Sequence, residues 1–140
     1  MSERIAVIGG AGAMGAVDVE VAQKHGHEVM IVDPKVENFM TTEEIIAWAS
    51  VLRFSLFPKD FVPFYQAYGH LIRPHQVVIE NATVKKEMLA PLGELDARGV
   101  SSISTHRLAK HDQPLRGTKE LVMGVGQNSQ KAREFVQRED

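Results

Sequence analysis

Two groups of residues in this sequence stand out by type and spacing: a glycine series near the N-terminus and a set of polar side chains that follow later apolar runs. The glycine series is the stretch IAVIGGAGAMG, in which an apolar run leads into Gly10, Gly12 and Gly15. After a buried strand, such glycines permit a tight turn, let the backbone approach a pyrophosphate, and let a helix pack closely on the strand. Ala13 and Met14 complete the start of that helix, whose free N–H groups favour a phosphate.

An acidic residue completes this fingerprint. Asp33 ends the apolar run EVMIV, about 20 residues after the glycines, which is where dinucleotide-binding sequences carry a carboxylate. A carboxylate there accepts hydrogen bonds from ribose hydroxyls and repels a 2′-phosphate, so the sequence predicts NAD in preference to NADP. Lys35, a positively charged residue two positions after Asp33, weighs against the preference for NAD. The alternative interpretation is a glycine turn that serves only to pack a helix on a sheet.

The second group follows three later apolar runs. In an open parallel sheet, ligands bind outside the carboxyl ends of the strands, so residues just after these runs are expected to surround the reactive ring of the cofactor. Phe57 and Pro58 offer an apolar edge suited to flank a ring. The polar side chains after the next two runs are Asn81, Thr83, Lys85, His106 and His111.

The elements that must position these residues form an alternating pattern. Apolar runs of strand length alternate with longer amphipathic stretches, which is typical of βαβ units around a parallel sheet. We predict an α/β fold, a Rossmann-type doubly wound and mostly parallel sheet of about six strands, in a single domain over residues 1–140. The predicted strands are 4–8, 28–32, 51–56, 76–80, 100–105 and 120–125, and the predicted helices are 12–25, from 42 onward, 61–71, 88–95 and 129–138.

Some residues fit this pattern without showing a function. Phe61, Phe64, Tyr65 and Tyr68 recur at helical spacing, which predicts core or interface packing. Arg53 falls inside a predicted buried strand, and the sequence identifies no partner for it. The remaining histidines, at positions 25, 27, 70 and 75, lie near predicted helix ends or turns and are expected to be solvated or capping groups.

Composition narrows the class of protein. The sequence has 140 residues, of which 44% are hydrophobic and 24% charged, and none of its apolar runs approaches the roughly 20 residues that a membrane span needs. Zero cysteines and no secretory signal pattern favour a cytoplasmic protein. A net charge of −2 makes nucleic acid an unfavourable partner. His106 and His111, with Asp112 beside them, lack a third placed ligand, so no metal site is predicted.

Several of these motifs together resemble a known family. In order and spacing they resemble the nucleotide-binding domain of the prephenate and arogenate dehydrogenases of tyrosine biosynthesis, and the resemblance spans nearly the whole chain. The motifs are GGAGAMG, SLFP, IENATVKKEMLAPL and STHRLAKHDQPLRGTKELVMGV. In the family, the third motif carries aspartate, an apolar residue, threonine, serine, valine and lysine, and the histidine opens a His-Pro-Met-Phe-Gly loop.

The resemblance implies an NAD-dependent oxidation of a cyclohexadienyl substrate, with hydride transfer followed by loss of carbon dioxide. It implies that His106 is the general base for the ring hydroxyl and that Thr83 orients it in place of the family's serine. Lys85 matches the family's lysine. An imidazole suits this role because it can take up a proton near neutral pH.

The sequence also departs from the family. Arg-Leu-Ala-Lys follows His106 where the family has a proline and a close Phe-Gly, and Glu80 and Asn81 replace an aspartate and an apolar residue. The family continues into a helical domain that dimerises and supplies an arginine for a substrate carboxylate, whereas this sequence ends at Asp140.

We therefore expect a homodimer or a partner chain to complete the pocket for a small-molecule substrate. The candidate anion ligands that could replace the family's arginine are Arg107, Lys110 and Arg116. Lys85 and His111 are further candidate substrate residues, with Lys85 shaping or charging the pocket. Two other functions stay open: a nucleotide-binding module without turnover, and a dehydrogenase or reductase for another small hydroxy acid or imine.

Overall fold

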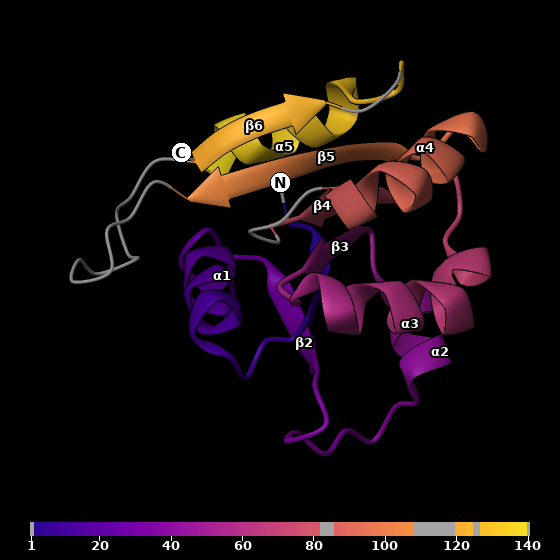
Figure 1. Ribbon diagram of the computed structural model, residues 1–140. Helices are drawn as coiled ribbons and strands as arrows, with labels where there is room; N and C mark the ends of the chain where they lie inside the picture. The colour runs from indigo at the N-terminus through magenta and orange to yellow at the C-terminus, as the bar shows by residue number, and fades with distance from the viewer. Residues whose placement is uncertain (1, 82–85, 108–119, 125–126, 140) are drawn as a thin grey trace.

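The computed structural model describes residues 2–81, 86–107, 120–124 and 127–139, with 87, 106, 107 and 120–124 described by their backbone alone. Within them the chain forms one six-stranded sheet in the order β2-β1-β3-β4-β5-β6 (Figure 1). The first five strands pair in parallel, and β6 runs antiparallel to β5. The predicted doubly wound, mostly parallel Rossmann-type sheet is therefore confirmed. The strands are β1 Arg4–Ile8, β2 Glu28–Val32, β3 Val51–Phe54, β4 Val77–Glu80, β5 Ser101–Arg107 and β6 Glu120–Gly124.

Helices cover both faces of the sheet. Helices α2, α3 and α4 pack on one face, and α1 and α5 pack on the other (Figure 1). The helices are α1 Ala13–Lys24, α2 Thr42–Trp48, α3 Pro58–Tyr68, α4 Leu89–Ala97 and α5 Gln130–Glu139, with short 3₁₀ turns η1 Gly69–Leu71 and η2 Lys86–Met88. No helix within the described residues is both long enough and apolar enough to cross a membrane.

Strands β1 to β4 divide their apolar side chains between two cores. In β1, Ala6 and Ile8 belong to the core under α2, α3 and α4, whereas Ile5 and Val7 belong to the core under α1 and α5. Because both faces are covered, these four strands are apolar on both sides, which explains their near-continuous apolar runs. Phe61 is buried in the larger core, with the other three predicted aromatic residues of its series partly buried against it, so the predicted packing of this series is confirmed.

Local signals fix several boundaries. Thr41 caps α2 through a capping box: its Oγ1 accepts from the Glu44 N–H at 3.1 Å, and Glu44 Oε1 accepts from the Thr41 N–H at 2.8 Å. Strand β3 ends at Phe54, two residues before its predicted end, and the chain then turns into α3 with Pro58 at its start. Strand β5 extends beyond its prediction because it pairs with β6 up to Arg107.

The order of the strands creates a switch point at the carboxyl end of β1. The chain passes from β1 to β2 on one side and later returns to place β3 on the other side. In such sheets, a crevice for ligands opens at this point.

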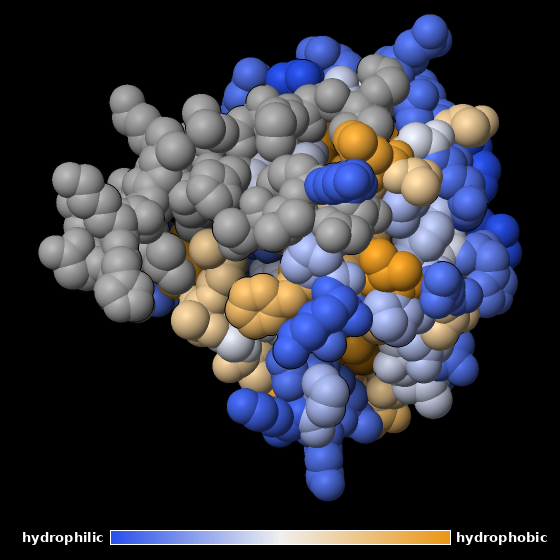
Figure 2. All heavy atoms as spheres, viewed as in Figure 1, coloured by the Kyte–Doolittle hydropathy of each residue, from blue (hydrophilic) through white to orange (hydrophobic). Residues whose placement is uncertain are grey.

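On the face shown in Figure 2, the coloured hydrophobic residues form small separate groups among hydrophilic ones. The expected homodimer stays a prediction.

Candidate functional site

The glycine turn after β1 lies between the ends of β2 and β3. Gly9 adopts a left-handed conformation, with φ +89°, and its N–H donates to Val32 O at 2.8 Å. A Cβ at Gly9 would lie 2.4 Å from Ser55 O, so no other residue fits there without a shift. Gly10, to which the sequence pattern assigned the tight turn, lies in the same turn without a positive φ, and a Cβ there would lie 2.7 Å from Cγ2 of Ile31.

Gly15 and Gly12 are glycines for different reasons. A Cβ at Gly15 would lie 2.2 Å from Gly9 O, which confirms that this residue lets α1 pack closely on the turn. At Gly12 the nearest atom to a Cβ would be Gly9 O at 3.6 Å, an ordinary contact distance. Packing within the described chain therefore gives no reason for a glycine at position 12, whereas a ligand that touches the backbone there would give one.

The amino end of α1 suits a phosphate. Its N-cap, Gly12, provides no side-chain hydrogen bond, and no acidic residue lies in the first turn, which contains Ala13, Met14 and Gly15. The first N–H groups of a helix lack partners within the helix and carry a partial positive charge. A bound anion would satisfy them.

Asp33 lies against the glycine turn, as its place in the fingerprint predicts. Its Oδ2 accepts a hydrogen bond from the Ala11 N–H at 3.2 Å, and its Oδ1 accepts from the Lys35 N–H at 3.0 Å. Because each carboxylate oxygen can accept a further hydrogen bond, Asp33 can still bind a ribose hydroxyl.

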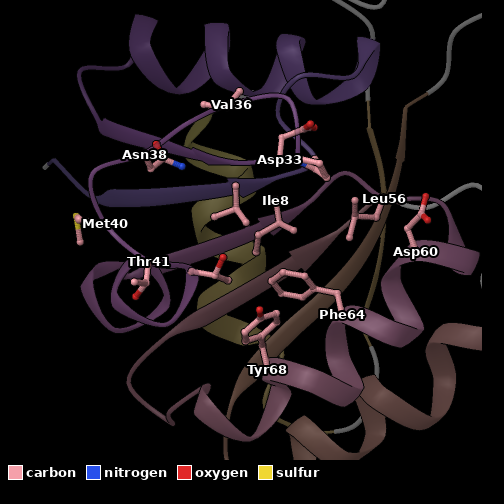
Figure 3. Close-up of a pocket in the computed structure, with 14 residues that line it drawn as sticks. Ile8, Asp33, Val36, Asn38, Met40, Thr41, Leu56, Asp60, Phe64 and Tyr68 are labelled. Carbon is pink, nitrogen blue, oxygen red and sulfur yellow. The ribbon is translucent and has the colours of Figure 1, made fainter.

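A cavity of about 670 Å³ opens beside Asp33, at the carboxyl ends of β1, β2 and β3 (Figure 3). This volume suits a small organic ligand. Its walls are mostly apolar, with polar groups from the loop after β2, from the start of α2 and from α3. The lining residues are Ile8, Gly9, Val32, Asp33, Pro34, Val36, Asn38, Met40, Thr41, Thr42, Leu56, Asp60, Phe64 and Tyr68.

Several of these lining residues were not anticipated as site residues. Phe64 and Tyr68 were predicted to pack in the core; they do so, and they also line the cavity from α3. Asn38 lines the cavity too, and its Nδ2 donates to Ile31 O at 2.7 Å, which holds the loop after β2 in place. The position of Asn38 in the loop after β2, where the crevice opens, could have identified it, whereas no local pattern places Phe64 and Tyr68 at the cavity.

The structure describes only some of the other predicted site residues. Phe57 is the N-cap of α3 and is 66% exposed, Pro58 follows it, and neither lines the cavity. The backbones of His106 and Arg107 lie at the carboxyl end of β5, opposite Leu121 and Glu120. Their side chains lie outside the described part of the chain. The other predicted residues outside it are Thr83, Lys85, Lys110, His111, Asp112 and Arg116.

A buried polar network lies beneath the glycine turn, and it explains Arg53. Arg53 Nε lies 3.1 Å from Asp18 Oδ1, and both residues are almost fully buried. Asp18 Oδ2 accepts hydrogen bonds from Ser55 Oγ at 2.6 Å and from Asn81 Nδ2 at 2.8 Å. One carboxylate of α1 thus holds the ends of β3 and β4 together.

The same network reaches α5. Arg53 Nη1 lies 3.6 Å from Glu139 Oε1, and Glu139 Oε2 lies 3.3 Å from His27 Nε2. His27 Nδ1 accepts a hydrogen bond from the Glu3 N–H at 2.9 Å. The expectation that His27 is solvated is therefore corrected, because α5 covers it. Burial lowers the pKa of His27, and the nearby Glu3 charge opposes that shift.

Buried polar contacts also join the carboxyl ends of β4 and β5. Ser104 Oγ donates to a carboxylate oxygen of Glu80, and Thr105 Oγ1 donates to Glu80 O at 3.4 Å. All three residues are almost completely buried. These contacts fix the backbone immediately before His106.

Comparison with known proteins identifies the fold of this chain but does not identify its family. The sequence matches no protein-family model and no curated protein. Among solved structures, 3-hydroxyisobutyrate dehydrogenase of Mycobacterium tuberculosis is similar, with a TM-score of 0.78 and 20% identity, over 96% of this chain and 50% of that chain. Prephenate dehydrogenase of A. aeolicus, in complex with hydroxyphenyl propionate and NAD+, has a TM-score of 0.74 and 14% identity, over 98% of this chain and 56% of that chain.

An imine reductase of Streptomyces aurantiacus is also similar, with a TM-score of 0.63 and 14% identity, over 77% of this chain and 42% of that chain. The chain therefore spans about half the length of these proteins. At such low identity, the shared feature is the Rossmann-type fold.

Proposed function

We propose that this chain is the dinucleotide-binding domain of an NAD-dependent oxidoreductase. The observation that carries this proposal is the Asp33 carboxylate, which is bonded to the glycine turn at 3.2 Å and lines a cavity of about 670 Å³. The same turn has a glycine at position 12 that the described packing does not require. The names of the similar structures, which are dehydrogenases and reductases, support the same function.

Each part of the site has a proposed role in holding the dinucleotide. The N–H groups at the start of α1, with Gly12 and Ala13, would bind the diphosphate. Asp33 would accept hydrogen bonds from the adenosine ribose, and the apolar walls formed by Ile8 and Leu56 would contact the rest of the adenosine. The nicotinamide end would then lie toward the ends of β4 and β5.

His106 is our proposed general base. When bound, NAD supplies a hydride acceptor, and oxidation of an alcohol also requires a base to accept the hydroxyl proton. The backbone of His106 lies at the carboxyl end of β5, toward which we expect the nicotinamide ring to point, and the contacts of Glu80 with Ser104 and Thr105 fix the backbone before it. Thr83 and Lys85 keep their proposed roles of orienting the base and charging the pocket.

For the substrate, we propose a cyclohexadienyl acid of the prephenate or arogenate type. The sequence motifs support this choice, and a prephenate dehydrogenase is among the similar structures. A second candidate is a small hydroxy acid or an imine, because 3-hydroxyisobutyrate dehydrogenase and imine reductases share the same fold with this chain.

Two measurements test the proposal. Calorimetry with NAD, NADH and ADP-ribose should detect binding of all three; no binding of any of them contradicts the proposed function. Turnover is then followed by NADH absorbance with prephenate, arogenate and 3-hydroxyisobutyrate, and with a cyclic imine in the reductive direction. The substrate that reacts identifies the substrate class.

The variant His106→Asn should lose turnover and keep its affinity for NAD. The exposed His75, in the turn before β4, provides the matched control, and His75→Asn should leave turnover unchanged. Nucleotide binding without turnover of any substrate would instead identify a binding module.

A further inference from the structure

The cavity beside Asp33 has an unusual charge composition. Among its fourteen lining residues, the charged ones are two carboxylates, Asp33 and Asp60, and no lysine, arginine or histidine is present. Lys35 and Lys59 are each close in sequence to one of the carboxylates, but both are exposed and neither lines the cavity. Among the residues that the structure describes, those that line the cavity therefore present only negative charge to a ligand.

The two carboxylates differ in how they are held. Asp33, at the end of β2, accepts hydrogen bonds from two backbone N–H groups. Asp60 lies in the first turn of α3, where its N–H donates to Phe57 O at 2.9 Å, and its carboxylate has no hydrogen bond or ion pair with any described residue. In Figure 3 the two side chains come from different elements, with Leu56 between them in this view.

We infer that Asp60 is a second specificity-determining residue, which together with Asp33 excludes a phosphate from the adenosine ribose. The inference rests on the proposed function of the site. A phosphate monoester carries nearly two negative charges at neutral pH, and carboxylates on the wall of the same cavity repel it. Asp60 is exposed and Asp33 is half-buried, so solvent screens the charge of Asp60 more strongly. The cavity thus selects a neutral sugar, and it does so with a residue outside the dinucleotide fingerprint.

The alternative role for Asp60 is purely structural. An acidic residue in the first turn of a helix interacts favourably with the helix dipole. That role would affect the stability of α3 but would not distinguish NADPH from NADH. The ratio of the two dissociation constants therefore separates the two roles.

The experiment measures dissociation constants of NADH and NADPH, with ADP-ribose as a probe of the adenosine end, for the wild type and four variants. The variants are Asp33→Asn, Asp60→Asn, the double variant, and Glu43→Gln as the matched control. Glu43 is an exposed carboxylate in the first turn of α2 and does not line the cavity. Each titration is run at low and high salt.

We expect the wild type to bind NADH more tightly than NADPH. Asp33→Asn should lower the ratio of the NADPH to the NADH dissociation constant by about tenfold, and Asp60→Asn by about threefold because solvent screens its exposed carboxylate. The double variant should show a larger effect than either. Glu43→Gln should change the ratio by less than about twofold, because Glu43 lies outside the cavity.

Two results overturn the inference while leaving the proposed function intact: equal affinity of the wild type for both nucleotides, or an unchanged ratio in Asp60→Asn. Failure of NADH, NADPH and ADP-ribose alike to bind contradicts the proposed function and the inference together.

Discussion

Arg53 Nε lies 3.1 Å from Asp18 Oδ1 in the interior of the molecule, where the two residues are 4% and 2% exposed. This pair joins the middle of β3 to the second turn of α1. Glu139 on α5 approaches the same guanidinium at 3.6 Å. The helix that begins at the glycine turn is therefore tied to the sheet by charge as well as by apolar packing.

Removing the guanidinium should destabilise the protein strongly. Arg53→Met leaves the Asp18 and Glu139 carboxylates buried near each other without their shared cation, which should lower the free energy of unfolding by about 3–5 kcal/mol. Urea denaturation measures this change. Arg73→Met, at an exposed position before β4, is the control and should cost less than about 0.5 kcal/mol. A loss below about 1 kcal/mol for Arg53→Met would contradict a structural role for the pair.

Gly12 and Gly15 should respond differently to alanine. Gly12→Ala has room for its Cβ, so we expect a change in stability below about 1 kcal/mol but a loss of NAD affinity of about tenfold or more. Gly15→Ala places a Cβ against Gly9 O and should lower the free energy of unfolding by about 1–3 kcal/mol. Thermal denaturation and NAD titration of both variants check the contrast, which would be refuted by full NAD affinity in Gly12→Ala.

Stability should fall on mild acidification because of His27. Burial lowers the pKa of this imidazole from its ordinary value of 6.5, so the unfolded chain takes up a proton more readily than the folded chain does. The stabilising effect is complete above that value and is lost as the pH falls below it. Urea titrations at about pH 7.5 and about pH 5.5 should show a smaller difference in His27→Gln than in the wild type. The exposed His75→Gln should keep the wild-type difference; equal pH dependence in all three proteins would exclude His27 as its source.

The cap of α2 should contribute measurably to stability. Thr41→Ala removes the acceptor of the Glu44 N–H and should lower the free energy of unfolding by about 1 kcal/mol. Thr41→Ser keeps the hydroxyl and should recover most of the loss. The capping box also lowers the pKa of Glu44, chiefly through the hydrogen bond of its carboxylate to the Thr41 backbone and then through the Thr41 side chain. An NMR titration of the Glu44 carboxyl should therefore show a higher pKa in Thr41→Ala than in the wild type. An unchanged Glu44 pKa would contradict the cap.

Much of the fold follows from local sequence patterns. Strands β1 and β2 have their predicted bounds, and helix α2 begins at the predicted Thr42, because apolar runs and caps act over a few neighbouring residues. The glycine fingerprint also predicted that Asp33 belongs with the turn, since the spacing of a βαβ unit fixes that relation. The sequence by itself thus determined the fold class and the part of the candidate site nearest the glycine turn.

Only the tertiary structure decided which other side chains share that site and what Arg53 binds. Asp60, Phe64 and Tyr68 line the same cavity as the end of β2 because of the way α3 packs on the sheet, and no local pattern encodes that placement. Likewise, position 9 requires glycine because it has a positive φ and because Ser55 O, which follows β3 far along the chain, leaves no room for a Cβ. Arg53 is buried because Asp18 and Glu139 converge on it from opposite ends of the sequence. Periodicity and capping depend on neighbouring residues, whereas these contacts depend on segments that meet only when the sheet assembles.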